Sequence, residues 1–209
     1  FWLHCNFITS EGQKFSKSLG NAYTLSELKE KGFSPLDYKL WVLQGHYQSE
    51  RNFTLVDLKS AQVRRLKWKN QIAELLQSTE NKLIDYQDKN ILIDFLQSIL
   101  RKNDAPKTTL SRQILDYASD NLNSAEAFSY IDQHSLTLDD WAVVEQLFGL
   151  GLFAEQTPPS PETMDQITTR NQARKQKDFQ TADELRAQIE QAGFIIKDGL
   201  DQPIWQYYK

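Results

Sequence analysis

Apolar side chains recur through the middle of the chain at the three- and four-residue spacing of amphipathic helices. The spacing predicts one long helix from Thr54 to Ser78 that buries Leu58, Ala61, Leu66 and Ile72. Shorter helical patterns follow at 89–102, 109–119, 123–133 and 138–149. Because only short links join them, we expect these helices to form an antiparallel bundle.

Strand-like patterns are confined to the two ends. At the amino end, Leu3 to Thr9 is rich in β-prone residues and Glu11-Gly12 supplies a tight turn, which predicts a strand leading into a hairpin. Two short helices are predicted next: Thr24 with Glu27 forms a capping box, and Ser34-Pro35 places proline at a first helical position.

The last fifty residues have their own organisation. The proline-rich segment Thr157 to Pro161 predicts a stiff linker and a domain boundary. Helices are expected at 161–176 and 178–192, and a terminal hairpin is expected from Phe194 to Ile196 and Pro203 to Trp205. These residues therefore predict a helical hairpin with a short β tail.

Composition narrows the function classes. The 209 residues include a single cysteine, Cys5, which excludes an intrachain disulfide and a cysteine-based zinc site within this chain. No apolar run approaches the twenty residues that cross a bilayer, so we expect no membrane partner. The use of a single cysteine makes a reducing cytoplasm the expected location. The net charge of -4 argues against a uniformly cationic nucleic-acid binder. Two stretches without acidic residues, Lys59 to Lys69 and Arg170 to Lys177, are nevertheless basic; each reads as a solvated helix face or as a nucleic-acid contact.

Candidate chemistry lies in the stretch Gln13 to Asn21. Lys14 and Lys17 stand three residues apart, where two ammonium groups can flank a polyphosphate. Ser16 and Ser18 add hydrogen-bond donors. No glycine stands where a P-loop requires it, and by composition alone a solvated surface loop is the better explanation of the stretch.

The order of residues adds a resemblance. Lys-Phe-Ser-Lys-Ser followed by Leu-Gly-Asn resembles the KMSKS signature of class I aminoacyl-tRNA synthetases, with Phe15 in place of methionine. Along the whole chain, the order of motifs resembles the C-terminal half of the cysteinyl-tRNA synthetase family. These motifs are Trp2-Leu3-His4, Gly45-His46-Tyr47, Asn52-Phe53, Asp120 to Ala125, Phe148 to Leu152, Ala173-Arg174-Lys175, Asp178-Phe179 and Ala182-Asp183. Two departures stand out, because Gln48 replaces an arginine and Cys5-Asn6 replaces an Asn-Gly or Ser-Gly pair.

The resemblance implies a mainly α fold in three parts. A strand and hairpin that end a class I, Rossmann-type catalytic domain would occupy 1–53, a tRNA-binding helical bundle 54–156, and an anticodon-binding module 157–209. The implied partners are ATP, with magnesium, and the cysteine tRNA, and the full-length enzyme is expected to be a monomer. The HIGH motif and the zinc ligands of the family belong to its N-terminal half. We therefore assign no metal ligand here and expect this chain alone to be inactive.

Residue roles follow from the same resemblance. Lys17, and after it Lys14, would stabilise the charge that develops on the leaving pyrophosphate, while Ser16 and Ser18 would shape the loop around ATP. Lys59, Arg64 and Arg65 on the long helix would meet tRNA phosphates. Arg174, Asp183 and Asp198 would read the anticodon. Phe179 is expected in the core, with stacking on a base as the alternative.

Two other functions stay open at this point. One is a related ligase that joins cysteine to a glucosaminyl-inositol by the same adenylate chemistry, although such an enzyme has no use for an anticodon module. The other is a stand-alone RNA-binding helical protein that has lost catalysis. Retention of Lys14 and Lys17 counts against that reading, because a pure binder needs no pyrophosphate clamp.

Overall fold

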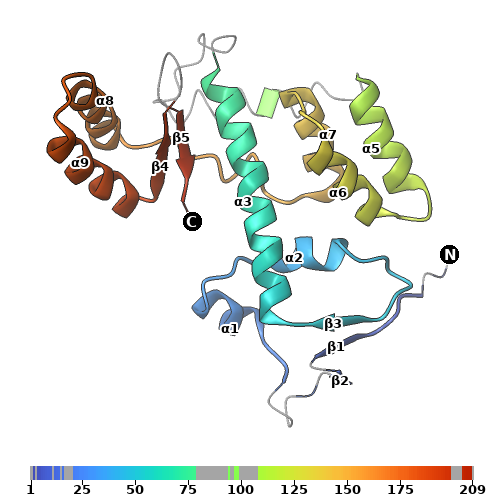
Figure 1. Ribbon diagram of the computed structural model, residues 1–209. Helices are drawn as coiled ribbons and strands as arrows, with labels where there is room; N and C mark the ends of the chain where they lie inside the picture. The colour runs from blue at the N-terminus through green and yellow to red at the C-terminus, as the bar shows by residue number, and fades with distance from the viewer. Residues whose placement is uncertain are drawn as a thin grey trace. The chain divides into compact units, whose positions relative to one another are not determined.

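The computed structural model is mainly helical with short strands, as the sequence predicts (Figure 1). It describes residues 2, 4–10, 12–14, 16, 21–78, 94, 97, 98, 108–198 and 204–208. The chain forms two compact units. Unit 1 comprises Phe1–Arg65 and Asn103–Gly151, and unit 2 comprises Leu66–Lys102 and Leu152–Lys209. The long helix α3 (Leu55–Gln77) contributes residues to both units, and the predicted helix at 89–102 lies almost entirely outside the described residues.

Unit 1 combines a small sheet with helices. Besides the first part of α3, its elements are β1 (Ile8–Ser10), β2 (Gln13–Lys14), α1 (Leu25–Glu30), α2 (Pro35–Leu43), β3 (Arg51–Phe53), α5 (Thr109–Ser119), α6 (Ser124–Gln133) and α7 (Leu138–Phe148). The strand order is β2-β1-β3. β1 and β2 form the predicted antiparallel hairpin, whereas β3 pairs with β1 in parallel. Strand β3 was not predicted, because three residues are too few to show an alternating pattern.

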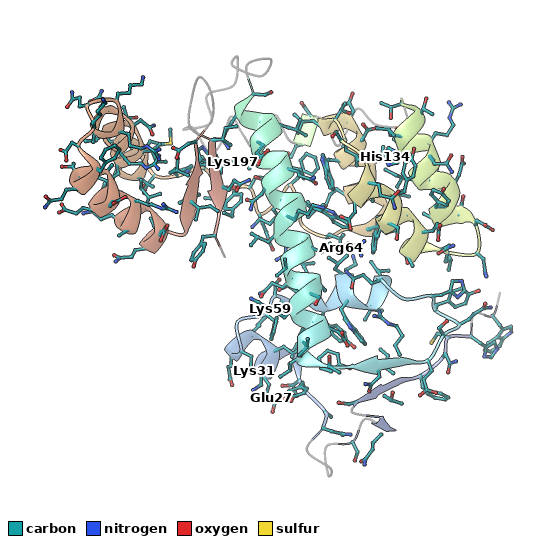
Figure 2. The ribbon with its side chains drawn as sticks, in the orientation of Figure 1. Glu27, Lys31, Lys59, Arg64, His134 and Lys197 are labelled. Atoms are coloured by element: carbon teal, nitrogen blue, oxygen red, sulfur yellow. The ribbon has the colours of Figure 1, made fainter. Side chains whose placement is uncertain are left out.

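Side-chain caps fix where the helices of unit 1 begin. The predicted capping box of α1 is confirmed: Thr24 Oγ1 accepts a hydrogen bond from the Glu27 amide at 3.2 Å, and Glu27 Oε2 accepts from the Thr24 amide at 2.6 Å (Glu27 is labelled in Figure 2). Reciprocal caps also open α2, α5 and α7, at Ser34, Thr108 and Thr137. Each satisfies amides that lack a partner within the helix, so local residues set these boundaries.

The turn between α5 and α6 is tied to the loop after α2. Asn121 and Leu122 both adopt the left-handed conformation, with φ of 50° and 54°, which is unfavourable for a non-glycine residue. Asn121 Oδ1 accepts a hydrogen bond from Tyr47 Oη at 2.8 Å, and Ser124 Oγ donates to the Leu43 carbonyl at 2.6 Å. These bonds hold the strained turn in place and join two segments that the sequence resemblance had singled out separately.

Unit 2 packs a helical hairpin on a two-stranded sheet. Its elements, besides the second part of α3, are α8 (Pro161–Lys175), α9 (Phe179–Gln191), β4 (Phe194–Lys197) and β5 (Ile204–Tyr207). Strands β4 and β5 pair antiparallel in the predicted tail. The buried cluster that holds the unit together consists of Ala73, Ile167, Ile189, Trp205 and Tyr207. Ser160, near the end of the predicted linker, caps α8.

Candidate functional sites

The stretch Gln13 to Asn21 that contains Lys14 and Lys17, which we call the lysine loop, begins in strand β2 of the β1–β2 hairpin. Lys14 is the last residue of β2, and Ser16 lies beyond it. The Ser16 amide donates to Asn21 Oδ1 at 2.9 Å, and Asn21 Nδ2 donates to the Ser10 carbonyl at 3.5 Å. Asn21 thus joins the loop to the end of β1. Lys17, Ser18 and the Lys14 side chain lie outside the described part of the chain, so their roles remain predictions.

Arg65 corrects one sequence expectation. Its side chain is buried, and its Nε donates to Asp37 Oδ1 at 2.7 Å, with only 1% of the Asp37 side chain exposed. Asp37 also accepts from the Ser34 amide at 2.8 Å and from Gln62 Nε2 at 3.2 Å. A guanidinium committed to a buried carboxylate cannot face an RNA phosphate. The expected phosphate contact at Arg65 is therefore wrong, and the residue holds α3 against α2.

The other cations of α3 divide between packing and exposure. Arg64 Nη2 lies 2.6 Å from Asp132 Oδ2, its guanidinium lies over the Phe128 ring, and 23% of its side chain is exposed. Lys69 is buried beside Glu155. Lys59 is exposed on the helix surface and donates to Gln62 Oε1 at 2.7 Å (Arg64 and Lys59 are labelled in Figure 2). Of the three predicted contacts on this helix, Lys59 is the most accessible and Arg64 the next.

Unit 2 brings together two of the predicted anticodon residues, Arg174 and Asp198, and a further arginine, Arg170. Asp198 follows β4, and its Oδ1 and Oδ2 accept from Arg170 Nη1 and Nη2 at 2.7 and 3.4 Å. Arg174, one helical turn after Arg170 on α8, donates to Asp198 Oδ2. Arg170 was read from sequence only as part of a basic stretch, although its i, i+4 spacing to Arg174 could have marked a pair on one helix face.

The three residues differ sharply in exposure. The Arg170 side chain is 3% exposed, whereas Arg174 and Asp198 are 43% and 47% exposed. Arg170 therefore acts as an internal support that fixes the Asp198 carboxylate, and the carboxylate orients Arg174 at the surface. The hydrogen bond from Arg170, and then the positive charges of Arg170 and Arg174, lower the pKa of Asp198 against the opposing effect of its partial burial.

The lowered pKa of Asp198 predicts a pH dependence of stability. A carboxylate with a folded-state pKa below its unfolded value, about 3.9, stabilises the fold above that value and loses this contribution as pH falls through the folded pKa. We expect the thermal midpoint of the chain to fall between about pH 5 and 3, and Asp198→Asn to remove part of that fall. Circular dichroism melts across this range measure both. The exposed Asp165 on α8 provides the control, since Asp165→Asn should keep the parental pH profile.

Asp183 and Phe179 both lie on the surface of α9. Asp183 is exposed, and no described contact joins it to the Arg170, Asp198 and Arg174 cluster. Phe179 is 61% exposed, so the expectation of a core position is wrong. It is the first residue of α9, one turn before Ala182 begins the buried face, and it is therefore available for stacking.

Within the described residues, no group of three histidine, cysteine, aspartate or glutamate side chains is placed to hold a metal ion. None of the described helices is both long and apolar enough to cross a membrane.

Comparisons with known proteins point in one direction. Residues 1–63 match a family model described as the class I (C) tRNA synthetase catalytic domain. A cysteine–tRNA ligase of Chlamydia muridarum is 31% identical over 213 residues, covering 95% of this chain and 44% of the relative. The cysteine–tRNA ligases of Caldicellulosiruptor saccharolyticus and Solibacter usitatus are 28% and 29% identical, covering 95% and 99% of this chain and 44% and 45% of those relatives.

The matches extend beyond the catalytic-domain model. They cover 95% to 99% of the chain and therefore reach into both units, whereas the family model ends at residue 63. The chain spans a little less than half the length of these curated relatives. Along nearly its whole length, the chain is therefore similar to a segment of cysteine–tRNA ligases, and its first 63 residues match the class I (C) catalytic-domain model.

Proposed function

We propose that this chain is the part of a cysteine–tRNA ligase that contributes the ATP loop and the tRNA-binding regions. The whole enzyme would activate cysteine with ATP and transfer it to the cysteine tRNA. The observation that carries the proposal is the similarity to cysteine–tRNA ligases over 95% or more of the chain. The glucosaminyl-inositol ligase is not favoured, because these relatives are all cysteine–tRNA ligases and their similarity includes unit 2.

In the activation step, the lysine loop would act on the leaving pyrophosphate. Attack of the cysteine carboxylate on the α-phosphate moves negative charge onto that group, and the Lys17 ammonium would stabilise this charge, assisted by Lys14. Ser16 and Ser18 would complete the loop around ATP, and magnesium bound with ATP would neutralise part of the phosphate charge. The anchoring of Ser16 by Asn21 supports a loop with a defined starting point.

In tRNA recognition, unit 2 would read the anticodon. Asp198 accepts a hydrogen bond from one amino group of Arg174, and the rest of this partly exposed guanidinium would donate to a base edge. The exposed Phe179 offers a face on which a base can stack, and Asp183 would accept from a base amine elsewhere on α9. On the long helix, Lys59 and the partly exposed Arg64 would meet phosphates without sequence preference.

The finer assignments belong to the same proposal. We propose that the chain divides into three parts, at 1–53, 54–156 and 157–209. We also propose that the full-length enzyme is cytoplasmic and monomeric, with its zinc site outside this chain. The alternative, an RNA-binding protein without catalysis, predicts a different result: its function would survive loss of the lysine loop.

Arg174→Ala tests the anticodon assignment. We expect binding of the cysteine tRNA to weaken by about 1 to 3 kcal/mol, while binding of the same transcript with another anticodon changes little. Fluorescence anisotropy with the two transcripts at one salt concentration measures this. The neighbouring exposed Lys175 serves as the control, since Lys175→Ala should weaken both complexes alike. Equal losses for Arg174→Ala would reduce that residue to a phosphate contact.

A further inference from the structure

One face of α3 binds the backbone of strand β5 through side-chain amides. Tyr207 donates its amide to Asn70 Oδ1 at 2.7 Å, and its carbonyl accepts from Asn70 Nδ2 at 3.1 Å. Gln77 lies two helical turns after Asn70 on α3. The Trp205 amide donates to Gln77 Oε1 at 3.0 Å, and the Trp205 carbonyl accepts from Gln77 Nε2 at 2.9 Å. Each amide thus takes the place of a neighbouring strand for one residue of β5.

Between these two amides, Glu74 contacts both strands. Its Oε1 accepts from Gln206 Nε2 on β5 and lies 3.3 Å from Lys197 Nζ on β4. Asn70, Glu74 and Gln77 have i, i+4, i+7 spacing and therefore share one helix face; we call them the polar ladder. Figure 1 shows β5 between β4 and α3, and Figure 2 labels Lys197.

The ladder ends next to the anticodon candidates. Lys197, which Glu74 contacts, directly precedes Asp198 in the chain, and β4 is registered on β5 with Lys197 opposite Ile204. The same β4–β5 sheet contributes Trp205 and Tyr207 to the core of unit 2. A side-chain amide that makes two hydrogen bonds to one residue fixes the position and the register of that strand. The ladder therefore fixes β5, and through the pairing of β5 with β4 it fixes the end of β4 and the position of Asp198.

We propose that Asn70 and Gln77, together with Glu74, are positioning residues for anticodon discrimination. They hold the β4–β5 sheet so that Asp198 meets Arg170 and Arg174 at hydrogen-bonding distance. This inference rests on the proposed function, since it deepens the role of the Asp198 cluster. The ladder acts through the sheet and does not itself touch RNA. Its loss therefore separates discrimination from general RNA affinity, which the exposed cations supply.

The test uses the 209-residue chain and two transcripts, the cysteine tRNA and the same tRNA with an altered anticodon. In the Asn70→Ala/Gln77→Ala double variant, we expect the ratio of the two dissociation constants to fall roughly fivefold or more, with affinity for the altered transcript kept within about twofold. Gln71→Ala on the same helix is the matched control and should keep the parental ratio; Gln71 makes no side-chain hydrogen bond in the described part of the chain.

Amide exchange shows whether the double variant loosens the backbone of β5. Amide exchange at Trp205 and Tyr207 should accelerate in the double variant, because both amides lose their acceptors. The conservative variant Asn70→Asp keeps an acceptor for the Tyr207 amide. Exchange of that amide should therefore be slower in Asn70→Asp than in the double variant. If the exchange changes while the discrimination ratio stays at the parental value, the ladder is only structural and the inference fails. If the parental chain itself does not distinguish the transcripts, the proposed anticodon function fails instead.

Discussion

Arg65→Ala is expected to destabilise unit 1 by about 3 to 5 kcal/mol, because it leaves the Asp37 carboxylate buried without its charged partner. Asp37 keeps its bonds to the Ser34 amide and to Gln62, but neither neutralises the charge. The measurement is urea unfolding followed by circular dichroism, with the midpoint and slope compared with those of the parental chain.

A charge-neutral replacement separates the cost of an unpaired charge from the cost of lost packing. Arg65→Met combined with Asp37→Asn removes both charges and should lose clearly less than Arg65→Ala alone. The exposed Arg112 on α5 gives the matched control, since Arg112→Ala should stay within about 0.5 kcal/mol of the parental chain. A small loss for Arg65→Ala would mean that water or another side chain reaches Asp37, and it would reopen Arg65 as a surface residue.

Lys17→Ala is expected to raise the barrier to cysteine activation by about 2 to 4 kcal/mol when the chain is part of a full-length ligase. The physical reason is that the substitution removes a positive charge whose benefit grows as charge develops on the leaving pyrophosphate. ATP–pyrophosphate exchange measures this step without tRNA. Affinity for the cysteine tRNA should stay unchanged, because the phosphate contacts that we propose on α3 and the base contacts that we propose in unit 2 do not involve the loop.

Lys29 supplies the control for that experiment. It is an exposed lysine on α1, so Lys29→Ala removes one positive charge from the same region without touching the loop. Its exchange rate should match that of the unmodified enzyme. An exchange rate unchanged by Lys17→Ala would instead leave the loop as a solvated surface feature, which is the simpler reading that its composition already allowed.

Local signals made much of the fold predictable. The helix boundaries at Thr24, Ser34 and Thr137 follow from residues within three positions of each cap, and the structure places helices there. The start of α8 was equally clear, because proline fixes its own φ angle at the first helical position and the Ser160 hydroxyl caps the helix. Such features need no knowledge of the rest of the fold.

Partners distant in sequence account for what sequence reasoning missed. Arg65 looked like a surface cation because its partner Asp37 lies 28 residues earlier. Arg170 is buried, and its ion-pair partner Asp198 lies 28 residues later. Phe179 fits the apolar period of α9 but stands one turn before the packed part of that helix. In each case tertiary contacts, and not the local sequence pattern, decided whether the side chain is covered.

The polar ladder also affects how the terminal sheet behaves toward other copies of itself. A strand with unpaired amides and carbonyls is a template for another strand, and β5 carries two large aromatic residues beside that edge. Asn70 and Gln77 occupy the edge at Trp205 and Tyr207. Residues 152–209 expressed without α3 would therefore expose an edge suited to intermolecular β-pairing, so the helix also protects the tail against aggregation.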